Sequence, residues 1–311
     1  MQKSKVSSQN FIKSWKTDLR RNGEIYLVAL PVILFFILFH YKSMYGVIIA
    51  FKNFSPTKGI MGSEWVGFKY FIQFFKDDYF LRLMKNTLTI SLATLLFSFP
   101  VPIIFALLLN ELKSKAFSRG VQLVAYLPHF ISLIVICGLI SKFTSADGIV
   151  TNILAFFGMD KVSYLNYPQY FVPIYVISDI WQEAGWNSII YLAALTGVDP
   201  QLYEAASIDG AGKFKQTIHV TLPGITPTIV VMLILRIGSL LNVGYEKIIL
   251  LYNPITYETA DVISTYVYRY GILDGSWSYS TAIGLFNSVI NFILLIAANK
   301  ISRKYSESSL W

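Results

Sequence analysis

Charged and amide side chains stand inside two long apolar stretches of this sequence, where they can bind a polar solute or one another. Such groups are costly within an apolar span and usually face a cavity or a partner. The charged and amide members are Asp179, Glu183, Arg236, Asn242 and Glu246. Neighbouring amide and aromatic members are Trp181, Asn187, Tyr191 and Tyr245. These residues offer the hydrogen bonds and ring faces that sugars require, and we expect them to line a solute path.

A structural alternative stays open for the same residues. With a rise of about 1.5 Å per residue, Glu183 and Arg236 both fall near the middle of their stretches. In this alternative the two form a buried structural ion pair, and the aromatic residues belong to the belts at the membrane interfaces.

The sequence gives little support for catalytic chemistry. The single cysteine, Cys137, lies in an apolar run, and His40, His129 and His219 are far apart, so no metal-ligand spacing is present. The stretch 207–214, SIDGAGKF, resembles the end of a phosphate-binding loop. It has Ser where Gly is required and Phe where Ser or Thr would hold magnesium. We therefore expect no catalytic residue, no metal, no cofactor bound by this chain and no ATP hydrolysis by it.

Composition indicates a membrane protein. The 311 residues are 54% hydrophobic and 14% charged, whereas soluble domains average about 25% charged residues. The apolar residues form runs of about 20, the length of a transmembrane helix. We expect an all-α membrane protein with six transmembrane helices, at 25–41, 88–110, 121–143, 171–197, 225–251 and 280–299. The expected organisation is a tail over 1–24, a six-span domain over 25–299 and a tail over 300–311.

Proline and basic residues add detail to this topology. Pro100, Pro102 and Pro128 lie inside expected spans and predict kinks. The later outer loops, 144–170 and 252–279, hold one basic residue each. Since basic residues gather on the cytoplasmic side, we expect both termini in the cytoplasm, and the net charge of +8 reflects orientation.

The first outer loop is an exception to this charge bias. It carries several lysines, and the alternation of aromatic and charged residues over 68–88 predicts an amphipathic helix on the outer surface.

The loop 198–224 is a polar island that we expect to face the cytoplasm. Asp199 followed by Pro200 predicts a helix start, because Asp caps helices and Pro suits the first turn. Gly210 and Gly212 interrupt that helix, and a second helix is expected from Lys213. Two short helices at a bend form a compact knob that a soluble partner can grip.

The knob resembles the EAA loop of binding-protein-dependent ABC importer permeases. The resemblance rests on Glu204-Ala205-Ala206, Asp209-Gly210-Ala211, Ile218 and Leu222-Pro223. The gap after Ile218 is longer than in the tightest form of the pattern. The resemblance implies the fold of a type I importer permease with a coupling-helix loop. It also implies that an ATPase is coupled through Glu204, Ala205, Ala206, Asp209, Gly210, Ala211 and Gly212.

Further segments look like carbohydrate importer permeases of the maltose type, in the branch for oligosaccharides and polysaccharide fragments. They are Tyr26-Leu27 to Pro31, 67–71, Asn86-Thr87 and 181–187. The resemblance implies a carbohydrate importer working by alternating access in the bacterial cell membrane. It implies four kinds of partner: a second permease forming a heterodimer, two ATPase subunits that use ATP and Mg, an extracellular substrate-binding lipoprotein and the carbohydrate itself. The alternatives are an ABC importer for a non-sugar solute and a channel without an ATPase.

Overall fold

The computed structural model describes residues 18–19, 21–305 and 309–310. This part of the chain is predominantly helical, so the all-α expectation is confirmed. It separates into two compact units, one up to Gly67 and the other from Phe68 onward. The expected tail over 1–24 lies mostly outside the described residues. Within the expected tail over 300–311, the last helix continues to Tyr305.

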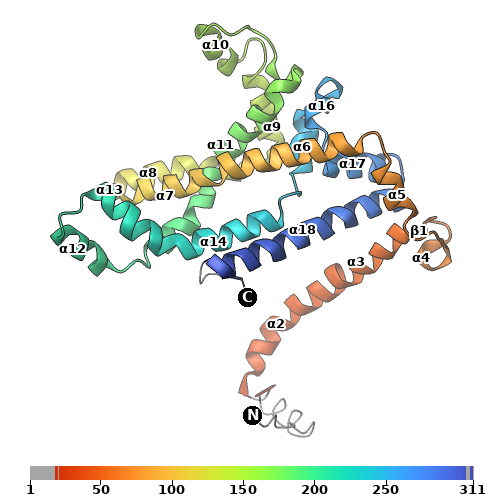
Figure 1. Cartoon of the computed structure of the whole chain (residues 1–311), viewed down its shortest axis with the longest axis horizontal. Coiled ribbons are helices and arrows are strands. Elements are labelled where there is room, and N and C mark those ends of the chain that lie inside the picture. The colour runs from red at the N-terminus through yellow and green to blue at the C-terminus, as the bar shows by residue number, and fades with distance from the viewer. Residues whose placement is uncertain (1–17, 20, 306–308, 311) are drawn as a thin grey trace. The chain divides into compact units, whose positions relative to one another are not determined.

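The first unit is one long apolar helix followed by a small hairpin (Figure 1). The helical run Gly23–Phe51 has 29 residues and is apolar enough to cross a membrane. It extends beyond the expected span of 25–41 because apolar residues resume after Lys42. Its segments are α2 (Gly23–Phe35), η1 (Phe36–Tyr41), α3 (Lys42–Met44) and η2 (Tyr45–Phe51). The antiparallel strands β1 (Lys52–Asn53) and β2 (Glu64–Trp65) flank α4 (Gly59–Gly62).

The second unit contains the remaining helices (Figure 1). Its first half comprises α5 (Lys69–Phe75), α6 (Phe80–Ala93), η3 (Thr94–Ser98), α7 (Pro100–Asn110), α8 (Lys115–Tyr126), η4 (Leu127–Phe130), α9 (Leu133–Phe143), α10 (Ile149–Phe156) and η5 (Tyr164–Asn166). Its second half comprises α11 (Pro168–Leu195), α12 (Pro200–Ile208), α13 (Lys213–Gln216), η6 (Thr217–Thr221), α14 (Leu222–Gly238), α15 (Tyr245–Leu251), η7 (Pro254–Thr256), α16 (Tyr257–Ala260), α17 (Ile263–Tyr268), η8 (Arg269–Leu273) and α18 (Trp277–Tyr305).

Three buried clusters hold the second unit together. One joins α7, α11 and α14 around Tyr191. A second joins α9, α11 and α15 around Ile136, and the third joins α5, α6, α17 and α18 around Phe74. Helix α11 takes part in two of the clusters and packs most extensively against α7, while α14 packs against α18. Long helices therefore surround α11 as the central element.

Length and composition identify fewer spans than the six expected. Among the described residues, four helical runs are long and apolar enough to cross a membrane, or five if a bent pair counts as one span. Helix α11 is outside this set although it has 28 residues, about 42 Å at 1.5 Å per residue. The six-span count therefore stays a prediction.

The third expected span is broken, which corrects the single helix expected over 121–143. The runs Lys115–Phe130 and Leu133–Phe143 meet at 100°. Pro128 lies in the 3-10 turn η4, Ile131 is extended, and the Ser132 side chain caps the next helix. A proline cannot donate the helical hydrogen bond, so the chain can leave the helix here.

The fifth expected span, 225–251, is also divided. Helix α14 ends at Gly238, and α15 starts only at Tyr245. A Cβ atom at Gly238 would stand 2.5 Å from Leu295 Cδ1 and 3.1 Å from Leu295 Cβ, so α18 approaches closely here and a larger residue would displace the Leu295 side chain. Just beyond, the Leu241 N–H donates to Asn291 Oδ1 at 3.0 Å instead of continuing a helical ladder.

The amphipathic helix expected over 68–88 is two helices, α5 and α6, separated at Asp77. The Asp77 carboxylate accepts hydrogen bonds from the Tyr79 N–H at 2.9 Å and from the hydroxyls of Tyr266 and Tyr279 at 2.6 and 2.7 Å. Burial raises the pKa of Asp77, but these three hydrogen bonds outweigh it and hold the pKa below its ordinary value. The carboxylate thereby ties the turn to α17 and α18.

Candidate functional site

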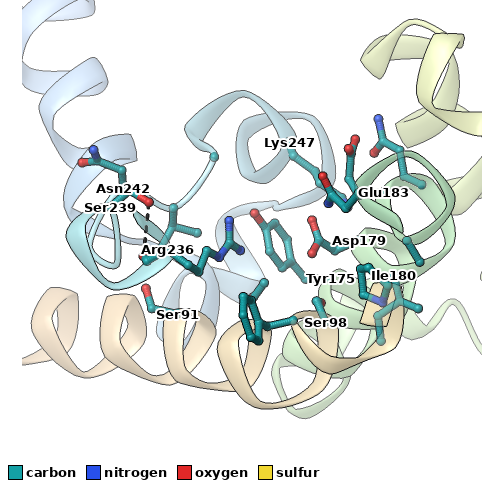
Figure 2. A pocket seen from close by; sticks show the side chains of 18 of the residues that line it. Ser91, Ser98, Tyr175, Asp179, Ile180, Glu183, Arg236, Ser239, Asn242 and Lys247 are labelled. Atoms are coloured by element: carbon teal, nitrogen blue, oxygen red, sulfur yellow. Dashed lines mark hydrogen bonds between the residues drawn. The ribbon is translucent and has the colours of Figure 1, made fainter. Parts of the chain in front are cut away.

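A cavity of about 800 Å³ lies in the second unit among α6, η3, α7, η4, α11, α14 and α15 (Figure 2). One wall is a stripe along α11 formed by Tyr175, Asp179, Glu183, Asn187 and Tyr191. These residues recur every four positions, so each is a neighbour of the next on the surface of α11. The volume is within the range of about 300 to 1,000 Å³ that holds drug-sized ligands.

Most of the residues expected on a solute path meet at this cavity. The lining includes Asp179, Glu183, Asn187, Tyr191, Arg236, Asn242 and Glu246. Trp181 is outside the lining and is 44% exposed, because it lies two positions from Asp179 and so faces another side of α11. Tyr245 is also outside it, and its ring stacks on Tyr268 at 5.8 Å between centroids. A role in solute binding stays a prediction for all nine.

Glu183 pairs with a residue other than the expected Arg236. Its Oε2 accepts a hydrogen bond from His129 Nδ1 at 2.9 Å. The His129 ring stacks on Trp186 at 4.5 Å with an interplanar angle of 4°. Among the described residues no ion pair joins Glu183 to Arg236, although both line the cavity. The break after Pro128 brings His129 to this wall.

Lys247 is the buried cation of the cavity. It lies on α15, is 5% exposed and lines the cavity close to Tyr175 (Figure 2). Its Nζ lies 4.9 Å from the centroid of the Tyr175 ring. Within the described part of the chain, Nζ has no hydrogen-bond partner.

An amide network fixes the connection between α14 and α15. Asn242 Oδ1 accepts hydrogen bonds from Asn287 Nδ2 at 2.9 Å and from Asn291 Nδ2 at 3.0 Å. These bonds tie α18 to the connection between α14 and α15, and they position Asn242 at the cavity wall.

The knob forms as its sequence predicts. Helix α12 begins at Pro200, and Asp199 caps it by accepting from the Gln201 N–H at 2.9 Å. Gly210 has φ of +77° and turns the chain, and α13 begins at Lys213. Helix α12 has no buried residue. The coupling residues implied by the EAA pattern therefore lie on a protruding element.

An internal clamp holds the two knob helices together. The side chain of Gln216 is buried and donates through Nε2 to Ser207 Oγ at 2.9 Å and to the Ala211 carbonyl at 3.1 Å. The Tyr203 hydroxyl donates to Thr221 Oγ1 at 3.0 Å. These bonds bridge the sequence on either side of Gly210, so the bend keeps one shape.

The knob is attached directly to the cavity walls. Helix α11 enters it and α14 leaves it. Where the two meet, a Cβ atom at Gly224 would stand 2.8 Å from Val198 Cγ2. The same two helices carry Glu183 and Arg236. The knob is therefore continuous in sequence with two helices that line the cavity.

Sequence reasoning missed several of these residues. Lys247 follows Glu246 inside an expected span, so a search for every charge within a span would have found it. Tyr175 lies four positions before Asp179 and could be found by extending the helical stripe. His129 and Gln216 give no such signal, since both depend on contacts across a break or bend.

The comparisons with known proteins agree with this geometry. Residues 98–307 match the family described as "Binding-protein-dependent transport system inner membrane component". The chain is 44% identical to Protein LplB of Bacillus subtilis over 96% of this chain and 94% of that protein. It is 45% identical to the B. subtilis polygalacturonan/rhamnogalacturonan transport system permease protein YteP over 92% and 90%.

A solved structure extends the similarity to the fold. A chain of a bacterial ABC transporter that imports the acidic polysaccharide alginate superimposes with a TM-score of 0.85 and 46% identity, covering 94% of this chain and 99% of that one. The matched residues 98–307 include the knob and the cavity helices from α7 onward. The chain belongs to the family of binding-protein-dependent transport system inner membrane components.

Proposed function

We propose that this chain is the permease subunit of an ATP-driven ABC importer for carbohydrate, with an oligosaccharide as its cargo. The observation that carries the proposal is the direct connection of an exposed knob to a polar cavity through α11 and α14. The names of the relatives support a saccharide, because YteP is named for polygalacturonan and rhamnogalacturonan and the solved importer for alginate.

An importer permease of this kind works with partner proteins. The proposed assembly contains a second permease, two ATPase subunits and an extracellular substrate-binding lipoprotein. The alginate transporter crystallised with a periplasmic protein bound to an alginate pentasaccharide, which supports the last of these. ATP and Mg belong to the ATPase subunits, so the present chain is a translocation subunit without catalysis of its own.

The knob is the proposed contact with the ATPase. Ile208 and Phe214 are 87% and 77% exposed on it, and large exposed apolar groups mark interaction surfaces. Glu204 adds an exposed negative charge that can form an ion pair with an Arg or Lys of the partner. The coupling residues are then Glu204 to Ala206 and Asp209 to Gly212. This role requires the knob and both termini to face the cytoplasm of a bacterial cell.

The proposed mechanism is alternating access. Nucleotide binding draws the two ATPases together, and their motion displaces α12. Because α11 and α14 continue from the knob into the cavity walls, the cavity opens alternately to the two sides. The nucleotide cycle supplies the energy, and this chain converts it into a shift between two populated states.

Deletion of residues 202–212 tests the proposal in proteoliposomes that contain the assembled importer and its binding protein. The deletion removes all of α12 except Pro200 and Gln201, together with Gly210, so co-purification of the ATPase and uptake of labelled oligosaccharide should both be lost. The matched control is Lys58→Ala in the exposed hairpin of the first unit, which should retain both. Continued uptake after the deletion would indicate a channel, and uptake of peptides alone by the unaltered importer would indicate a non-sugar cargo.

A further inference from the structure

The cavity contains a positive charge that the described residues leave without a hydrogen-bond partner. Lys247 Nζ is buried at the cavity wall and has neither a hydrogen bond nor an ion pair within 4.0 Å among those residues. The group that lies against it is the ring of Tyr175. A buried cation is stable only when an opposite charge or several acceptors compensate it. The carboxylates of Asp179 and Glu183 line the same cavity and attract this charge through space, but neither of them contacts Nζ directly. Nζ can therefore still form a direct ion pair with an anionic group that enters the cavity.

The charged residues around the cavity come from several elements. Asp179 and Glu183 belong to α11, whereas Arg236 and Lys247 belong to α14 and α15. Figure 2 shows Lys247 on the same side of the cavity as Asp179 and Glu183, with Arg236 apart from them. His129 on η4 donates to Glu183, and Glu246 also lines the cavity but is exposed, unlike its neighbour Lys247. The lining thus offers hydrogen-bond acceptors and charged donors within one cavity.

We propose that the cavity selects acidic saccharides, with the carboxylate of a uronic acid unit bound by Lys247 and Arg236. The sugar hydroxyls then donate to Asp179 and Glu183 on α11. A uronic acid carries both kinds of group on one ring, so it can contact the carboxylates and the cations at once. A neutral sugar contacts the carboxylates but gives Lys247 no direct ion pair. This inference rests on the proposed carbohydrate cargo.

Lys247 can reach such a ligand at small cost. Its side chain has four rotatable carbon–carbon bonds and holds no hydrogen bond that must break. The contact with Tyr175 is a cation–π interaction, which is weaker than a charge-assisted hydrogen bond to a carboxylate. The ammonium therefore gains by turning from the ring to a bound carboxylate.

The test measures direct binding to the assembled importer in nanodiscs without its binding protein, so that only the membrane cavity selects the ligand. Isothermal titration compares digalacturonate with its carboxyl-reduced counterpart, digalactose. The unaltered importer should bind digalacturonate at least about tenfold more tightly, the ratio that corresponds to about 1.4 kcal/mol. Lys247→Gln and Arg236→Gln should each weaken digalacturonate binding about tenfold and leave digalactose binding within about twofold.

Three further variants test whether the charges at the cavity cause this preference. Lys247→Arg should restore the preference for digalacturonate, and Glu246→Gln should increase it because a competing negative charge is removed. Lys300→Gln, at an exposed position on α18 outside the cavity lining, should change neither affinity. Equal affinity for the two sugars, or equal loss of both in Lys247→Gln, would overturn the acidic preference and leave the carbohydrate importer intact. Absence of binding and uptake for both sugars and for other neutral oligosaccharides would overturn the proposed function itself.

Discussion

Gly185 is the position where adding one methyl group should do most harm. A Cβ atom there would stand 2.1 Å from the carbonyl oxygen of Ala125 and 2.5 Å from its carbonyl carbon. Real Cβ atoms essentially never come within 3.0 Å of such an atom, so α8 and α11 would have to separate by roughly 1 Å. Because the obstacle is backbone, no side-chain rotation can relieve it. Overpacking of this kind costs about 1–3 kcal/mol.

Gly120→Ala provides the matched control. Gly120 lies on α8, and a Cβ atom added there would meet nothing within 4 Å, so the substitution gains only the helix propensity of alanine, about 1 kcal/mol. Gly185→Ala gains the same propensity but adds the clash. We therefore expect the unfolding midpoint of the assembled importer, measured by differential scanning fluorimetry, to fall for Gly185→Ala and to rise slightly or stay constant for Gly120→Ala.

Gly185→Ala should also disturb the wall of the cavity. Separation of α8 from α11 moves η4, and with it the His129–Glu183 hydrogen bond of 2.9 Å. Transport by Gly185→Ala should therefore decline at temperatures where the protein is still folded. An unfolding midpoint equal to that of Gly120→Ala, with unchanged transport, would refute the proposed backbone contact.

Three other predictions concern the knob, the amide network and the turn before α6. Gln216→Leu removes both hydrogen bonds of the clamp. The backbone amides of the knob should then exchange hydrogen faster, and ATP-driven transport should decrease. Lys215→Gln, at the exposed neighbouring position, should change neither measurement. Asn291→Leu leaves the Leu241 N–H without its acceptor and should destabilise the fold by about 1–3 kcal/mol in chemical unfolding; no loss would mean that water replaces the amide. The pKa of Asp77 is lowered on folding, so its stabilisation is present above the ordinary value of 3.8 and is lost as pH falls through the lower folded pKa. Asp77→Asn should therefore be less stable than the unaltered protein at pH 6, and the difference should shrink below pH 4; a constant difference would exclude this carboxylate as the titrating group.

Local chemistry made the knob predictable from the sequence. Asp199, Pro200 and Gly210 act within a few residues of their own position, and the helix start and the bend follow from them. Charges within apolar stretches likewise predicted much of the cavity lining, because a helix places every fourth residue on one face. Trp181 lies outside that lining because it was selected by residue type and not by its place in the stripe.

The breaks in the third and fifth expected spans were not predicted in full. Pro128 indicated a kink near the first break, but hydropathy continues across Ile131 and across Gly238, so the hydropathy pattern ends no helix at either place. The second break is fixed by Leu295 and Asn291, which lie about 50 residues or more away in the sequence. The pairing of Glu183 with His129 is a consequence of the first break. Contacts of this kind are decided by packing, which single-sequence periodicity does not contain.

The clamp at Gln216 bears on the thermodynamics of docking. A loop that must become ordered upon binding loses conformational entropy, on the order of 1–2 kcal/mol for each residue fixed. Here Ser207 and Ala211 are already held by the Gln216 amide before any partner arrives. In the proposed contact with an ATPase, the knob would therefore dock as a preorganised body, and little of the free energy of contact would be spent on ordering the loop.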